Sequence, residues 1–456
     1  MTPPMTYTGH ARAILWLGLP LIGGHLAQFA IGLTDTVMLG WYGVAELAAI
    51  TLAASYFFVF FILGAGFALA VMPMVAAAAA SQDQIAVRRI TRMGLWLSLG
   101  YAVLALPAMI WAGPILRVLG QGDEVSTLAA QYLRVAGWGL IPALLVMVLK
   151  SYLAALERTQ VVLWITLVAA ATNALANYAL IFGHWGAPEL GIIGAAIASV
   201  LSQAVSLAAV IAYAALALPA HSLFRRLWRP DWEMFGRVFR LGLPIGLTTL
   251  SEVSLFSASA LMMGWLGTVP LAAHGIVVSI SSGTFMVHLG LGNVATIRAG
   301  NAFGRGDRAH LARGGVVVTA LSLGFAVLTI LAFLLFPVPL LSLYMEDANP
   351  ERQAIIGIGV GLLAIAALFQ LVDSAQAMAL GLLRGVQDTR VPLLIAVLSY
   401  WAVGIPSSYL LGFVFGLGGV GIWLGLVVGL ACAGLLLMRR FWGSALARVG
   451  AAEQTV

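Results

Sequence analysis

Long apolar runs, separated by short polar segments, dominate the chain. Each run reaches or exceeds the roughly 20 residues that an α-helix needs to cross the hydrocarbon core of a membrane. Runs of this length also exclude the shorter, alternating strands of a membrane β-barrel. The pattern predicts an all-α integral membrane protein with twelve transmembrane helices, at about residues 14–40, 45–78, 91–113, 127–149, 160–183, 191–217, 237–267, 271–296, 315–337, 354–384, 391–413 and 417–438.

The apolar pattern occurs twice along the chain. Residues 17–49 align without a gap with residues 241–273, at an offset of 224, and twelve of the thirty-three positions are identical. A later segment, residues 153–159, resembles residues 383–389 at an offset of 230. The chain therefore consists of two related halves, each with six of the predicted helices.

Both halves begin on the same side of the membrane, because each contains an even number of predicted spans. Such a parallel repeat predicts two six-helix lobes related by a pseudo-twofold axis along the membrane normal, with the main cavity between them. Rocking of one lobe against the other would give alternating access. The predicted organisation is an N-terminal six-helix lobe at residues 1–217, a cytoplasmic inter-lobe linker at residues 218–236 and a C-terminal six-helix lobe at residues 237–456.

Composition agrees with a membrane location, since 62% of the residues are hydrophobic and only 9% are charged. No water-soluble fold could bury so large an apolar fraction. The formal net charge of +6 does not indicate a nucleic-acid partner, because the basic residues collect in the termini and in the loops that follow even-numbered spans. By the positive-inside rule, this distribution predicts that both termini are cytoplasmic.

The loops and the cysteine content exclude other classes of protein. Cys432 is the only cysteine, so an intramolecular disulfide and a thiolate metal cluster are excluded. The longest polar connection, from about Leu218 to Gly236, is too short to be a soluble catalytic domain. We therefore expect no enzymatic activity, no catalytic residue and no cofactor, and we expect the chain to act as a monomer in the bilayer.

Three glycines recur in the last predicted helix at a spacing of four residues. They are Gly421, Gly425 and Gly429. This spacing places all three on one face, where the absence of side chains lets another helix backbone approach closely. The stripe predicts tight helix packing rather than a binding site.

Three acids, Asp35, Glu252 and Asp373, lie well inside the predicted spans, whereas all 23 Lys and Arg residues lie at interfaces or near helix ends. The spans thus offer no opposing cation. A buried carboxylate without a partner must take up a proton or bind a cation, so each acid is a candidate coupling site for Na⁺ or H⁺. The helical rise places Glu252 and Asp373 at a similar depth near mid-membrane, where they could meet. Asp35 lies nearer the external end, where a carboxylate that caps or hydrogen-bonds a helix terminus is the alternative.

Polar side chains accompany these acids inside the spans. Asn173 and Asn177 lie one helical turn apart and could donate their amides to a ligand or to Asp35, or could hold helices together by hydrogen bonds. His288 could titrate near neutral pH or could be a hydrogen-bonded packing residue. The predicted polar cavity for substrate consists of Asn173, Asn177, Gln28, Gln370, Gln376 and His288.

Three segments and the duplicated twelve-span layout together resemble the multidrug and toxic compound extrusion (MATE) family, in particular its bacterial NorM-type branch. The segments are LTDTVMLGWYG in span 1, SEVSLFSASALMMGWLG in span 7 and FQLVDSAQAMALGLLRGVQDTRVP across span 10. The resemblance implies an antiporter of the bacterial inner membrane that exports cationic, amphipathic compounds in exchange for Na⁺ or H⁺. It also implies that Asp35, Glu252 and Asp373 match the branch's functional acids, with a Na⁺ site at the latter two, and that Asn173 and Asn177 match its span-5 amides.

The sequence departs from this branch at two positions. Phe369 stands where relatives often have a tyrosine whose hydroxyl can contribute to the cation site, and His288 stands where relatives commonly have proline. The first change removes a neutral oxygen ligand and the second adds a titratable group. Both changes favour protons over sodium, and the coupling ion stays open between the two.

Two other functions are compatible with a membrane protein of this size. A lipid-linked oligosaccharide flippase of the same broad superfamily would need a cationic cavity for a pyrophosphate, whereas these spans offer acids. A membrane-embedded transferase would need a large catalytic loop, and the loops here are short. The flippase is the alternative that we retain.

Overall fold

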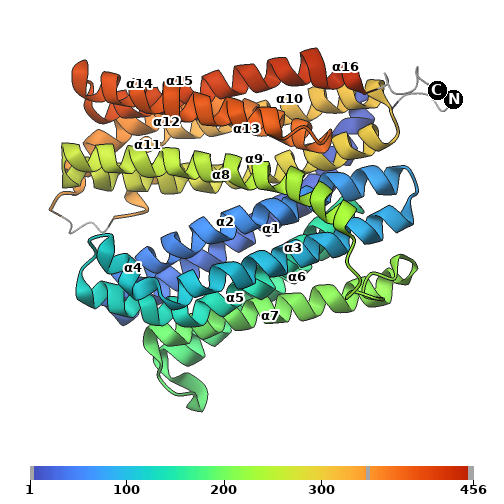
Figure 1. Cartoon of the computed structure of the whole chain (residues 1–456). Coiled ribbons are helices and arrows are strands. Elements are labelled where there is room, and N and C mark those ends of the chain that lie inside the picture. The colour runs from blue at the N-terminus through green and yellow to red at the C-terminus, as the bar shows by residue number, and fades with distance from the viewer. Residues whose placement is uncertain (1–4, 346–349, 450–456) are drawn as a thin grey trace. The chain divides into compact units, whose positions relative to one another are not determined.

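The computed structural model describes residues 5–345 and 350–449, and every regular element in these ranges is helical (Figure 1). Within the described part of the chain, twelve helices are long and apolar enough to cross a membrane, as predicted. Eleven of them are α1 (Tyr7–Tyr42), α2 (Val44–Ala80), α3 (Gln84–Ile110), α5 (Asp123–Ala155), α6 (Thr159–Phe182), α7 (Gly191–Ala217), α8 (Trp232–Leu266), α9 (Thr268–Gly304), α10 (Arg308–Leu335), α12 (Arg352–Gly385) and α15 (Gly418–Arg440).

The eleventh span is composite, and short helices complete the fold. The span consists of α13 (Arg390–Val397), the π-helical η3 (Leu398–Gly404), α14 (Ile405–Tyr409) and the π-helical η4 (Leu410–Val414). Pro406 lies at the start of α14 and has no N–H to donate, which interrupts the α-helical pattern of this span. The short helices are α4 (Ala112–Val118), η1 (His184–Gly186), η2 (Pro219–His221), α11 (Pro337–Ser342), η5 (Phe441–Ala445) and α16 (Leu446–Arg448).

The helices form two compact units, and each unit contains one segment from the other half of the sequence. The N-terminal unit is Gly23–Gly246, and the C-terminal unit contains the residues up to Ile22 and those from Leu247 onward. The two boundaries lie 224 residues apart, which is the offset of the repeat. In the predicted lobes, the first part of α1 belongs to the N-terminal lobe and the first part of α8 to the C-terminal lobe. In the structure, the first part of α1 belongs to the C-terminal unit and the first part of α8 to the N-terminal unit.

Close helix contacts explain this exchange. In the N-terminal unit, a Cβ atom on Gly66 of α2 would lie 2.5 Å from Gly242 O and Gly246 N of α8. In the C-terminal unit, a Cβ atom on Gly290 of α9 would lie 3.0 Å from Ile22 Cα of α1. Gly66 and Gly290 are again 224 residues apart. Because only glycine allows such close approach, these positions seat the opening part of α8 in one unit and that of α1 in the other.

The turns after the fourth and tenth spans confirm the predicted repeat. Glu157 follows α5 with a φ of 61°, and Gln387 follows α12 with a φ of 60°. Each donates its backbone N–H to the carbonyl three residues earlier at 2.9 Å. Left-handed backbone is uncommon for residues other than glycine. The same unusual turn, 230 residues apart, is therefore a shared structural feature of the segments at 153–159 and 383–389.

One helix lies at the centre of each unit. In the N-terminal unit α5 packs against α2, α3 and α7, and in the C-terminal unit α12 packs against α9, α10 and α15. These are the fourth and tenth spans, which correspond in the repeat. Because α12 carries Gln370, Asp373 and Gln376, the polar groups predicted for span 10 lie in the helix at the centre of their unit.

The glycine stripe of α15 packs as predicted. A Cβ atom on Gly425 would lie only 2.2 Å from the backbone nitrogen of Ser408, and one on Gly429 would lie 2.8 Å from Gly404 Cα. A Cβ atom on Gly421, one turn earlier in α15, would lie 2.4 Å from the carbonyl carbon of Leu411 in the same composite span. The stripe therefore brings α15 into direct backbone contact with η3, α14 and η4.

The linker between the repeats is held by arginines of α3. Arg89 forms an ion pair with Asp231, just before α8, and lowers the pKa of that carboxyl below its ordinary value. Arg92 Nε donates to Leu223 O at 2.8 Å, and Trp96 Nε1 donates to Leu227 O at 2.8 Å. The basic and aromatic side chains of α3 thus fix the linker to the N-terminal unit.

Candidate functional site

The C-terminal unit brings Glu252 and Asp373 into one neighbourhood. Glu252 projects from α8 and is half-buried, whereas Asp373 of α12 is only 2% exposed. The two carboxylates lie close enough to interact electrostatically. The structure therefore places the two acids within electrostatic range of each other in the second half of the chain, and their coupling role stays a prediction.

Gln376 and Tyr400 complete this neighbourhood, which we call the Glu252 cluster (Glu252, Asp373, Gln376 and Tyr400). Gln376 is 1% exposed, and its Nε2 donates to the Tyr400 hydroxyl at 2.5 Å. The Gln376 side chain also lies beside Glu252. The amide therefore joins a carboxylate on α8 to a phenol on η3.

Arg384 corrects one expectation from the sequence. It lies in the last turn of α12, and its guanidinium interacts electrostatically with Glu252 and Tyr400. The prediction that no cation is available to the intramembrane acids is therefore wrong for Glu252. The physical reason is the range of electrostatic interaction in apolar surroundings, where the charge of a residue near a helix end still acts on an acid inside the span.

His288 and Gln370 lie at a second polar position in the C-terminal unit. His288 Nδ1 and Ser322 Oγ are hydrogen-bonded at 2.8 Å, and the imidazole packs edge-on against Phe325. Gln370 is fully buried and lies beside His288. Phe369 packs edge-on against Trp423 at a centroid distance of 5.8 Å. Aromatic rings thus occupy the position where relatives often have a tyrosine hydroxyl.

The N-terminal unit builds a separate cluster around Asp35. Asn177 Nδ2 donates to Asp35 Oδ1 at 2.5 Å, and Ser199 Oγ donates to Asp35 Oδ2 at 3.1 Å. Asn177 Nδ2 also donates to Asn173 Oδ1 at 3.2 Å. Asp35, Asn173 and Asn177 are all buried. The predicted amide contact with Asp35 is confirmed, and the carboxylate binds side chains of α6 and α7 instead of capping its own helix.

Gln28 does not join this cluster. Its side chain is exposed on α1, two helical turns before Asp35, and it forms no hydrogen bond among the residues that the structure describes. The structure thus places this residue of the predicted polar cavity apart from the acid of its own helix.

Three further residues of these clusters have no clear signal in the sequence. Ser199 lies in a run of small residues typical of helix packing, Tyr400 lies beside a tryptophan in an apolar span, and Arg384 is one of many arginines at helix ends. Serine, tyrosine and terminal arginine are common in spans without any function. Only the tertiary contacts distinguish these three residues from similar ones.

Replacement of Asn177 tests the Asp35 cluster. Asn177→Leu removes the amide donor and leaves a buried carboxylate oxygen without its partner, so we expect a loss of stability of about 1–3 kcal/mol. Thermal unfolding of the purified protein in detergent measures this loss. Thr172→Val, at a half-buried position of the same helix whose hydroxyl donates, within the described residues, only to the carbonyl of Val168, is the matched control. Equal melting temperatures for the two variants would contradict the assignment.

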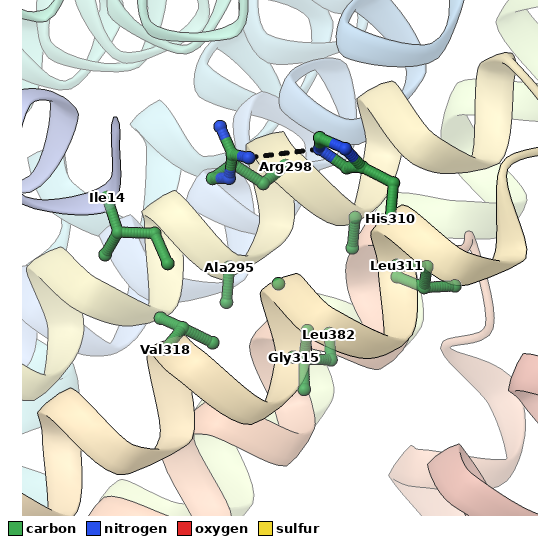
Figure 2. Close-up of a pocket in the computed structure, with 10 residues that line it drawn as sticks. Ile14, Ala295, Arg298, His310, Leu311, Gly315, Val318 and Leu382 are labelled. Carbon is green, nitrogen blue, oxygen red and sulfur yellow. Dashed lines mark hydrogen bonds between the residues drawn. The ribbon is translucent and has the colours of Figure 1, made fainter. Parts of the chain in front are cut away.

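The C-terminal unit also contains a small cavity away from both clusters. Figure 2 shows Arg298 of α9 and His310 of α10 facing each other at this cavity, which Ile14, Leu311 and Val318 also line. Arg298 Nη2 donates to His310 Nε2 and to His10 Nδ1, each at 3.0 Å. None of the predicted site residues lines this cavity. The arginine instead ties the opening part of α1 to α9 and α10.

Comparison with known proteins decides the family. The MatE family model matches residues 20–179 and 244–410, which cover most of both repeats and all three intramembrane acids. The chain belongs to the MatE family. The match follows the duplicated halves and confirms the resemblance found in the sequence.

Curated relatives of this MatE protein carry one name. The chain is 47% identical over 445 residues to a "Probable multidrug resistance protein NorM" of Rhizobium meliloti (strain 1021), covering 97% of this chain and 95% of the relative. It is 42% identical to the protein of the same name from Agrobacterium fabrum, covering 96% of this chain and 94% of the relative. The similarity thus extends over nearly the whole of each chain.

Solved structures share the fold of this MatE protein at low sequence identity. An outward-facing multidrug resistance MATE family transporter of the MOP superfamily has a TM-score of 0.87 at 20% identity and covers 98% of this chain and 97% of its own. A eukaryotic MATE transporter has a TM-score of 0.85 at 19% identity and covers 99% and 100%. These matches confirm the all-α, two-lobed fold of a multi-pass membrane protein.

Proposed function

We propose that this MatE protein is a secondary active multidrug antiporter that exports cationic, amphipathic compounds in exchange for Na⁺ or H⁺ by alternating access. The observation that carries the proposal is the meeting of Glu252 and Asp373 within an apolar helical unit. Two carboxylates in such surroundings attract a cation or a proton. The printed names of the NorM relatives support efflux of drugs as the function. The site of action is the bacterial inner membrane, with both termini cytoplasmic and the chain acting as a monomer.

The exchange that we propose is competitive. When the protein is open to the outside, Na⁺ or H⁺ binds to Glu252 and Asp373 and removes the negative charge that held a cationic drug. The drug then leaves, and the loaded protein turns toward the cytoplasm, where the ion dissociates. Thermodynamic reciprocity requires that drug binding weakens ion binding by the same factor.

Asp35 is separate from the two acids of the C-terminal unit. Its cluster belongs to the N-terminal unit, whereas Glu252 and Asp373 belong to the C-terminal unit. The Asn177 amide and the Ser199 hydroxyl satisfy the Asp35 carboxylate with neutral donors, and a bound cation could replace either of them. We propose that Asp35 is a second coupling acid, and that the remaining polar residues, Gln28, Gln370 and His288, contact the drug.

The coupling ion is the part of the proposal that an experiment must decide. In vesicles that contain the purified protein, we expect export of a fluorescent cation to follow one imposed gradient, either sodium at fixed pH or pH without sodium. Export that follows neither gradient would overturn the antiport mechanism. Competition between the fluorescent cation and other lipophilic cations, without competition from an anionic lipid-linked sugar, separates this function from that of a flippase.

A further inference from the structure

Tyr400 is a buried phenol that no step of the proposed exchange uses. It is completely buried in η3, the π-helical turn of the eleventh span. π-Helical turns within α-helices are rare and occur frequently at functional sites. Tyr400 is also within electrostatic range of Glu252, Asp373 and Arg384, which are the charged groups of this neighbourhood. An uncharged residue thus lies among all three of them.

Gln376 connects Tyr400 to the acids. It follows Asp373 by three residues, so both side chains lie on one face of α12. On the side of α15, Gly434 packs beside it, since a Cβ atom there would lie 3.6 Å from Gln376 Cβ, in ordinary van der Waals contact. The side chain is therefore confined between η3, α8 and α15.

The carbonyl oxygen of the Gln376 amide has no hydrogen-bond partner among the described residues. Gln376 Nε2 donates to the Tyr400 hydroxyl, and the amide lies beside Glu252, whose ionised carboxylate only accepts hydrogen bonds. Gln376 Oε1 is itself buried. A buried carbonyl oxygen without a partner is unfavourable, and such atoms often mark the place of a ligand or ion.

We propose that Gln376 Oε1 is a third oxygen for the coupling ion, beside Glu252 and Asp373, and that Tyr400 is the positioning residue that holds this amide in place. The inference rests on the proposed ion coupling at the two acids. Small cations are held in proteins by carboxylate and amide oxygens, which is the chemistry available here. If the coupling ion is a proton, the protonated carboxyl donates to the same carbonyl oxygen. Phe369 has no hydroxyl to offer the ion, and in this proposal the amide of Gln376 supplies the neutral oxygen in its place.

The test uses the purified full chain in detergent with ethidium as the fluorescent cationic probe. The half-saturating concentration of Na⁺, or the midpoint pH, is measured both from ethidium displacement and from ion-dependent thermal stabilisation. Because one hydrogen bond to the amide is lost, Tyr400→Phe should weaken ion binding about 3- to 10-fold. Ethidium affinity without the ion should stay within about twofold of wild type, since the phenol does not touch the drug in this proposal.

Two comparisons make the result specific. Tyr409→Phe is the matched control, because Tyr409 lies in the same span but is 49% exposed. Gln376→Met keeps the length of the side chain and removes the carbonyl oxygen, so it should weaken ion binding at least as much as Tyr400→Phe. If Tyr400 acts through Gln376, the double variant should be no weaker than Gln376→Met alone.

The outcomes separate this inference from the function on which it rests. A folded Tyr400→Phe protein with wild-type ion dependence overturns the inference, and so does full additivity in the double variant. Should Tyr400→Phe fail to fold, unchanged ion binding in Gln376→Met overturns it equally. In contrast, an unchanged ion effect in Glu252→Gln shows that the proposed coupling site itself is wrong.

Discussion

Glu252→Gln and Asp373→Asn should each abolish the effect of the coupling ion on drug binding. In the wild-type protein, we expect saturating Na⁺ or H⁺ to weaken binding of a cationic drug by about 5- to 150-fold, the usual range of coupling between two ligands. Each substitution removes a charge for which ion and drug compete, so this factor should fall to about one. Equilibrium drug binding with and without the ion measures the factor directly.

An exposed acid provides the control for these variants. Asp123 lies in the first turn of α5, pairs with Arg117 and has a side chain that is 91% exposed. Asp123→Asn removes the same charge from the same molecule and should leave the coupling factor unchanged. If both cluster variants retained full gradient-driven export in vesicles, the assignment of the two acids would have to be abandoned.

Gly425→Val should prevent folding of the C-terminal unit. The new Cβ atom would lie 2.2 Å from the backbone nitrogen of Ser408, and a backbone atom cannot move aside as a flexible side chain can. Overpacking of a core commonly costs about 1–3 kcal/mol, and a clash with backbone on both sides of a helix contact costs more. We expect little or no monodisperse protein after extraction in detergent, measured by size-exclusion chromatography.

A glycine without neighbours separates this effect from the general effect of losing glycine. Gly324 lies on the exposed face of α10, and a Cβ atom there would meet no atom within 4 Å. Gly324→Val should therefore yield folded protein, since the added side chain meets open space. Equal yields from the two valine variants would show that the contact between α15 and α14 does not limit folding.

The sequence predicts the helices, the repeat and the acids because these features depend on local chemistry. A run of apolar residues identifies a span wherever it occurs, and an acid within such a run is unusual in itself. The similar depth of Glu252 and Asp373 follows from helical rise, and the packing of their helices decides that the two acids lie near each other. The contact of Asn177 with Asp35 follows from residue type and depth, although the sequence leaves the ligand of this amide open.

The remaining parts of both clusters depend on tertiary packing. Arg384 cannot be recognised as a neighbour of Glu252 from its position at a helix end, because tertiary packing decides whether its charge lies within range of that acid. Tyr400 reaches Gln376 from a π-helical turn, and one extra residue in a turn rotates the face on which every later side chain lies. Gln28 shows the reverse case, since its predicted face is correct and its contact is absent from the described part of the chain.

The exchanged opening segments make the two halves of this duplicated chain inseparable. A fragment cut at the linker would keep the opening part of α1 without α9, against which it packs, and would lack the part of α8 that belongs beside Gly66. Neither half, when cut at the linker, is therefore a complete folding unit, although the two halves repeat one sequence pattern.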